Sequence, residues 1–98
     1  MEIEYANADL ERLATDPSFD GGHSREVIKG FRKRVQLIRA AVDERDFYAL
    51  KSLHFEKLKG DREGQHSMRL NKQWRLVLTL EKRSNGKTVV ILEIADYH

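Results

Sequence analysis

The stretch Trp74–Ala95 has the sequence WRLVLTLEKRSNGKTVVILEIA, in which two apolar runs flank a polar turn. Asn85-Gly86 lies between the runs, and this pair is the strongest short signal for a β-hairpin because tight hairpin turns need residues that tolerate positive φ. We therefore predict strands over 74–80 and 88–95, joined by a tight turn. They form an antiparallel pair to which further strands can add.

Shorter segments outside the hairpin also have the pattern of a half-buried strand. Apolar and polar residues alternate over 2–5 and again over 66–70, and a period of two places one residue type on each face of a strand. Polar residues 71–73 make a short connection to the hairpin. The glycine-containing segment 59–64 is expected to be a turn or loop. The strands together predict a mainly antiparallel sheet.

The segments between these strands have helical spacing instead. Apolar residues three or four apart predict a short helix at 8–15 and the main helix at about 25–42, with Ser24 as its N-cap. A further helical turn is expected after Asp46, which we assign as its cap. The apolar stripe of the main helix consists of Val27, Ile28, Phe31, Val35, Ile38 and Val42. The predicted order is β-α-α-β-β-β, an α+β fold with two helices packed on one face of the sheet.

Length and composition limit the class of protein. Ninety-eight residues make a single domain spanning 1–98, with a lean core because 40% of residues are hydrophobic and 35% are charged. No cysteine is present, so disulfides and thiolate metal sites are excluded. The four histidines lack metal-ligand spacing. We expect no metal or cofactor, no membrane segment and a cytoplasmic location.

The charge is distributed unevenly along the chain. Residues 1–20 carry six acids and one base, a net charge of −5, whereas residues 21–87 carry seventeen bases and eight acids, a net charge of +9. A basic block in so small a domain favours binding of a polyanion, above all nucleic acid. The alternative is an ordinary solvated helix surface held together by ion pairs.

Several motifs in the second half of the chain occur together in one known family. They are Leu53-His54, the run from Leu58 to Gly64 (LKGDREG), Ser67, Asn71, Trp74-Arg75 and the closing Asp96-Tyr97-His98. In this order they resemble the HigB-like toxins, also called plasmid maintenance killer proteins, of the RelE/ParE superfamily. The resemblance covers nearly the whole chain and is most specific over 53–98. It implies a RelE-like fold, in agreement with the predicted element order.

The resemblance also implies an activity and partners. HigB-like toxins of type II toxin-antitoxin systems cleave mRNA in the ribosomal A site and bind an antitoxin with a DNA-binding helix-turn-helix, through which they reach operator DNA. Family positions important for cleavage correspond to His54, Lys59, Arg75, Asp96, Tyr97 and His98. The segment 55–58 is longer here than in the family pattern, so Lys57 competes with Lys59 for the position of the active-site lysine.

These residue types suit RNA cleavage without a metal. The 2′-hydroxyl is a built-in nucleophile, so the reaction needs a base, positive charge at the phosphate and an acid for the leaving 5′-oxygen. We assign proton transfer to His98, with His54 as a second proton carrier, and phosphate stabilisation to Arg75 and Lys59. Tyr97 and Asp96 would position the substrate or the histidine. The expected RNA-binding residues are Lys57, Arg62, Lys72, Arg32, Lys33 and Arg34.

Other interpretations of the same residues remain open. Arg75 could be a structural residue that pairs across the sheet with Glu93 or Asp96. Lys59 could be an ordinary exposed lysine, and His98 part of a frayed end. At the level of function, a ParE-like toxin that inhibits gyrase by binding shares the fold, and a plain RNA-binding module would keep the basic face without needing His98.

Overall fold

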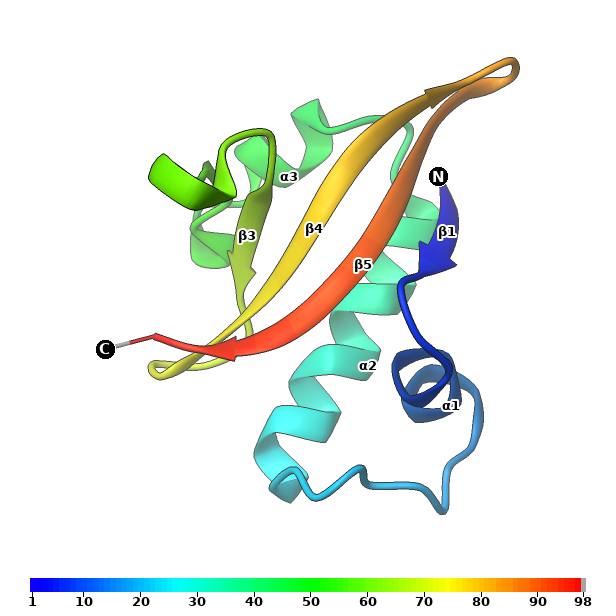
Figure 1. The fold of residues 1–98 in the computed structure, drawn as a ribbon, viewed down its shortest axis with the longest axis vertical. Helices are drawn as coiled ribbons and strands as arrows, with labels where there is room; N and C mark the ends of the chain where they lie inside the picture. Colours follow the sequence, from blue (N-terminus) through cyan, green and yellow to red (C-terminus); the bar gives the residue numbers. More distant parts are fainter. Residues whose placement is uncertain (98) are drawn as a thin grey trace.

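The computed structural model describes residues 1–97, so His98 lies outside the described residues. The elements are β1 (Glu2–Tyr5), α1 (Ala8–Thr15), α2 (Arg25–Ala40), α3 (Arg45–Ala49), the 3₁₀ turn η1 (Lys51–Leu53), β2 (Glu56–Lys57), the 3₁₀ turn η2 (Gly60–Arg62), β3 (His66–Arg69), β4 (Trp74–Arg83) and β5 (Gly86–Asp96). Five strands form one sheet in the order β1-β5-β4-β3-β2, and α2 runs behind it with α1 alongside (Figure 1). The α+β prediction is confirmed.

The β4–β5 hairpin is the centre of the sheet, as predicted. Its strands pair from Trp74↔Asp96 to Arg83↔Gly86, and β1 adds to β5 in the parallel direction. The register shifts by one residue between Val77, which pairs with Glu93, and Leu78, which pairs with Ile91. A bulge of this kind increases the local twist of a strand.

The two faces of the sheet differ in what covers them. Phe31 and Ile38 of α2 pack with Leu76 and Leu78 of β4 in one buried cluster. We call the side of the sheet under these helices the helix face. Val77 points the other way, since successive side chains of a strand alternate; it is fully buried but is not part of that cluster. The side to which Val77 points is called the open face.

Helix ends explain two differences from the sequence-based prediction. We predicted Val42 in the apolar stripe of the main helix, but α2 ends at Ala40 and the Val42 side chain is 84% exposed. Asp46 is not the cap of α3, whose N-cap is Glu44. The Asp46 carboxylate instead accepts a hydrogen bond from the backbone N–H of Val42 at 2.8 Å. The cap of α2 was predicted correctly, because the Ser24 side chain accepts from the N–H of Val27.

No helix within residues 1–97 combines the length and the apolar character needed to cross a membrane.

Candidate active site

Arg75 lies on the open face of the sheet, near the end of the hairpin opposite its turn. It pairs with Arg69 of β3 on one side and with Ala95 of β5 on the other. Residues directly opposite each other in neighbouring strands share a face. Arg75 also shares a face with Val77, which is two residues further along β4 and points to the open face. Only 11% of the Arg75 side chain is exposed, so neighbouring groups must hold its charge.

Four groups surround the Arg75 guanidinium. Its Nε donates a hydrogen bond to Ser67 Oγ at 2.9 Å, and its Nη2 donates to the backbone carbonyl of His54. The same Nη2 lies 3.7 Å from a carboxylate oxygen of Glu56. The guanidinium carbon is 5.6 Å from the centre of the Tyr97 ring, within the range of a cation–π contact. These contacts hold a permanent positive charge at the rim of the sheet.

Glu56 is a residue of this site that the sequence analysis missed. We weighed Glu93 and Asp96 as partners of Arg75, but Glu93 forms an ion pair with Arg62, and the carboxylate next to Arg75 is that of Glu56. Its side chain is 56% exposed, so a ligand can reach it. The sequence alone did not indicate this contact, because Glu56 comes close to Arg75 only through the pairing of β2 with β3.

The register of β2 separates the two candidate lysines. Lys57 pairs with His66, which pairs with Leu78 of the buried helix-face cluster. Lys57 therefore belongs to the helix face, whereas Arg75 is on the open face. Lys59 precedes η2, and Arg62 of that turn binds Glu93 on the open face. The geometry thus favours Lys59 as the lysine on the side of Arg75.

The end of β5 is fastened to the connection between β3 and β4. The backbone N–H of Tyr97 donates to the carbonyl of Gln73 at 2.7 Å, and the Gln73 side-chain amide donates to the Asp96 carboxylate at 3.1 Å. Lys72, in the same connection, is exposed. Of the predicted site residues, Tyr97 lies beside Arg75, whereas Asp96 pairs with Trp74, which packs against the core, and so belongs to the helix face. The predicted proton carrier His98, outside the described residues, follows Tyr97 in the chain.

His54 contributes to the site through its backbone. It has φ +47°, the left-handed conformation, and is the one residue other than glycine with positive φ among residues 1–97. This conformation is uncommon for residues with a Cβ, although histidine is among the more tolerant. It turns the carbonyl toward Arg75 Nη2, while the residue as a whole is exposed. A role of the imidazole in proton transfer stays a prediction.

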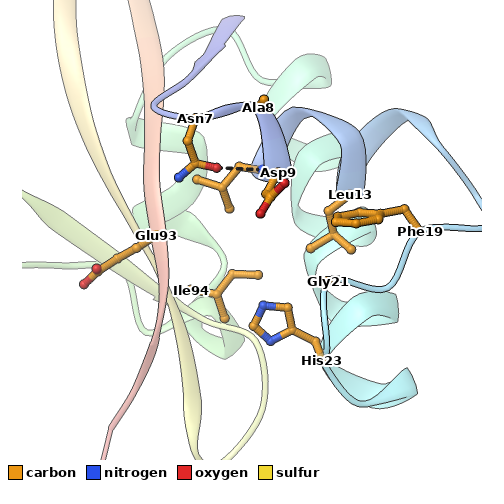
Figure 2. Close-up of a pocket in the computed structure, with 10 residues that line it drawn as sticks. Asn7, Ala8, Asp9, Leu13, Phe19, Gly21, His23, Glu93 and Ile94 are labelled. Carbon is orange, nitrogen blue, oxygen red and sulfur yellow. Dashed lines mark hydrogen bonds between the residues drawn. The ribbon is translucent and has the colours of Figure 1, made fainter.

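A hollow of about 460 Å³ lies on the other side of β5 from this site. Figure 2 shows the side chains of Ile94 and His23 facing one another across it, with α1 residues such as Asp9 along its upper wall, while Glu93 points away. Glu93 binds Arg62 on the open face. The hollow therefore contains none of the predicted catalytic residues.

A comparison with known protein families shows the family of this chain. The family model described as "RelE-like toxin of type II toxin-antitoxin system HigB" matches residues 3–98. This chain belongs to the HigB-like toxin family. No curated protein sequence matches it significantly.

Solved structures support the same fold for this HigB-like toxin. It matches the YoeB/ParE toxin from Agrobacterium tumefaciens with a TM-score of 0.60 and 19% identity over 100% of both chains. YafQ from E. coli strain BL21(DE3) gives 0.61 and 14% identity over 97% of this chain and 91% of that one. The YoeB-YefM complex from Staphylococcus aureus gives 0.61 and 20% identity over 100% of this chain and 97% of that one.

The cations of α2 in this HigB-like toxin are not equivalent. Arg32 donates to the backbone carbonyls of Leu13, Asp16 and Phe19 at 3.1–3.2 Å, so it binds the C-terminal end of α1. Arg34 donates to the carbonyl of Arg69 at 2.9 Å, and burial lowers its pKa. Lys33 is exposed. We predicted all three as RNA-binding residues, but two of them are engaged in contacts that hold the fold together.

We expect Arg32→Ala to lower the free energy of unfolding by about 1–3 kcal/mol, because it leaves carbonyls at the end of α1 without their charged donor. Lys33→Ala, its neighbour on the same helix, should change stability by less than about 0.5 kcal/mol. Thermal or urea unfolding of both variants measures the difference. Equal stability of the two variants would mean that the Arg32 contacts contribute nothing.

His66 lies at the edge of the core, as its alternation with Met68 and Leu70 suggested. Its ring stacks on Phe55 at 5.1 Å, and its buried Nδ1 has no hydrogen-bond partner among residues 1–97. Burial lowers the pKa of His66 from its usual 6.5, and the positive charge of Lys57 acts in the same direction. The ring is therefore neutral at neutral pH.

This pKa shift predicts how stability depends on pH. Below about pH 6.5 the unfolded chain takes up a proton at His66 more readily than the folded protein does, so the free energy of unfolding falls with falling pH. His66→Gln should have a flatter dependence between about pH 7 and pH 5. Urea unfolding at several pH values tests this, and parallel curves for the two proteins would contradict it.

Proposed function

We propose that this chain is the toxin of a type II pair that cleaves mRNA on the ribosome without a metal ion. The observation that carries the proposal is the largely buried, fixed Arg75 cation, with the exposed Glu56 and Tyr97 beside it. Among residues 1–97, no cluster of His, Asp or Glu suits a metal ion. The residues present supply the charge and proton carriers that metal-independent RNA cleavage requires.

The proposed reaction is an attack of the 2′-hydroxyl on the adjacent phosphorus. The O–P bond to the 2′-oxygen forms, the bond to the 5′-oxygen breaks, and the products are a 2′,3′-cyclic phosphate and a free 5′-hydroxyl. Glu56 or His54 accepts the proton of the 2′-hydroxyl, and His98 supplies the proton to the leaving oxygen. Arg75 and Lys59 stabilise the charge that builds up on the phosphate oxygens.

Other basic residues suit contacts with the rest of the RNA. Lys72 is exposed and precedes Gln73, whose carbonyl binds the backbone N–H of Tyr97. The side chain of Arg62 is 40% exposed although it is paired with Glu93. Lys33 belongs to α2, which covers the helix face. Lys33 is thus remote from the strand being cut, and it would contact ribosomal RNA or the antitoxin.

The proposed protein partner is an antitoxin. The structural relatives include two toxin–antitoxin complexes, YoeB-YefM from Staphylococcus aureus and RelBE2 from Mycobacterium tuberculosis. By analogy, this toxin would be neutralised in the cytoplasm by a helix-turn-helix antitoxin that also binds operator DNA.

Mapping of RNA ends on translating ribosomes tests the proposed function. The protein should produce cuts within coding regions of translated mRNA and none in the same mRNA without ribosomes, and Arg75→Ala should serve as the inactive control. Intact mRNA together with inhibited gyrase would support a ParE-like toxin instead. Binding to ribosomes without cleavage would support a plain RNA-binding module.

We expect Lys59→Ala to lower the cleavage rate about 10–100-fold more than Lys57→Ala does, because the strand register places Lys57 on the helix face, away from Arg75, and a cation near the phosphate stabilises its charge. The variants are a matched pair, since both remove an exposed lysine from the same segment. Single-turnover cleavage on ribosomes measures both rates. A larger loss for Lys57→Ala would reverse the assignment.

A further inference from the structure

We propose that Ser67 is a positioning residue that orients the Arg75 guanidinium toward the scissile phosphate. This inference rests on the proposed cleavage function and extends it to a residue with no role in the chemistry itself. Ser67 is in β3, next to β4, and its relative exposure is 0%. A hydroxyl buried this completely must be hydrogen-bonded to avoid a cost in stability. Its partner is Arg75.

The hydrogen bonds of Arg75 are divided unequally among its three nitrogens. Ser67 Oγ accepts from Nε, the His54 carbonyl accepts from Nη2, and the Ser67 carbonyl is 3.5 Å from the same Nη2. Within residues 1–97, no acceptor is found for Nη1. An arginine has five N–H donors in a rigid planar fork, so two N–H groups of Nη1 remain for a ligand.

The Nε bond matters because it fixes the plane of the fork. The His54 carbonyl and the Glu56 carboxylate both act on Nη2, and contacts at one end of the fork leave it free to pivot. The Ser67 hydroxyl adds a second point of contact at Nε, on the edge formed by Nε and Nη2, and two contacts along that edge fix the direction of Nη1. Glu56 is 56% exposed and can move with the ligand, whereas Ser67 is enclosed by the sheet. Ser67 is therefore the rigid support.

Loss of this support should reduce the chemical step more than it reduces binding. Ser67→Ala removes one oxygen, opens little space and leaves the charge of Arg75 in place. The RNA should still bind, but Nη1 would no longer be held where charge develops in the transition state. A misplacement of about 1 Å can reduce a rate by about 100-fold, so we expect kcat to fall by about 10–100-fold with KM nearly unchanged.

Three variants test the positioning role on ribosomes programmed with a short mRNA. Ser67→Ala should lower kcat, and Ser67→Thr should restore much of it because threonine keeps the hydroxyl. Thr88→Val is the matched control: Thr88 is also buried in the sheet, at 3% exposure, but it belongs to the part of β5 next to β1. A kcat for Ser67→Ala equal to that of Thr88→Val would overturn the proposal.

A measurement independent of cleavage separates this proposal from the proposed function. In ¹⁵N NMR spectra of the isolated protein, the Arg75 Nε–H signal should exchange slowly with water in the wild type and in Ser67→Thr, and rapidly in Ser67→Ala. Unchanged exchange in Ser67→Ala would overturn the positioning role. If exchange depends on Ser67 but Arg75→Ala cleaves normally, the contact exists but Arg75 takes no part in cleavage, which overturns the positioning proposal and leaves the proposed cleavage function standing.

Discussion

Arg75→Ala should lower the rate of mRNA cleavage by about 10²–10³-fold, the usual effect of removing one preorganised donor that stabilises transition-state charge. The physical reason is that Arg75 is held in place before the RNA arrives, by Ser67, the His54 carbonyl and Glu56. Little reorganisation is then needed during the reaction. Single-turnover cleavage on translating ribosomes, with ribosome binding measured in parallel, tests the effect on rate and affinity separately.

Arg75→Lys is the matched control for this prediction. It keeps the positive charge but loses the planar fork, so it cannot bind Ser67, the His54 carbonyl and a phosphate together. It should remain strongly impaired. Arg75→Ala also leaves the buried Ser67 hydroxyl without its partner, which should cost about 1–3 kcal/mol of stability, and urea unfolding must show that the variant is folded at the assay temperature. A folded Arg75→Ala protein that cleaves at the wild-type rate would exclude Arg75 from the reaction.

The elements that the sequence predicted well are those determined by local contacts. The β4–β5 hairpin follows from two apolar runs around Asn85-Gly86, and α1 was predicted with its observed bounds. The parallel pairing of β1 with β5 was not predicted, because nothing in residues 2–5 specifies which strand they join or in which direction. Val42 was misplaced for a related reason: its spacing fits the apolar stripe, but the helix ends two residues earlier.

The same distinction applies to the candidate site. Arg75 could be singled out as a charge within an apolar strand, but its partners could not. Ser67 and Glu56 reach it through the β3–β4 and β2–β3 pairings, which depend on register. Arg32 has contacts that the sequence did not indicate: it binds carbonyls 13 to 19 residues away in the chain, at the end of α1, while its predicted RNA binding stays a prediction. Side-chain type alone does not distinguish these roles.

His98→Ala tests the assignment of proton transfer, which depends on the sequence and the family resemblance. Tyr97, the preceding residue, has its ring 5.6 Å from the Arg75 guanidinium, so the chain leads to the candidate site immediately before His98. If His98 protonates the leaving 5′-oxygen, His98→Ala should reduce cleavage by about 10²–10⁴-fold, the usual contribution of general acid–base catalysis. Ribosome binding should be nearly unchanged, since the substitution leaves the basic residues around Arg75 in place.

The pH profile distinguishes proton transfer from simple positioning. A histidine acid should make the wild-type rate fall as rising pH removes its proton, and His98→Ala should lack that descending limb. His54→Gly is the matched control, because it removes the other candidate imidazole but keeps the carbonyl that binds Arg75 and suits the left-handed backbone at that position. Loss of the limb in His54→Gly but not in His98→Ala would transfer the role to His54. Wild-type cleavage rates for both variants would leave Glu56, Lys59 and Arg75 to act without a histidine.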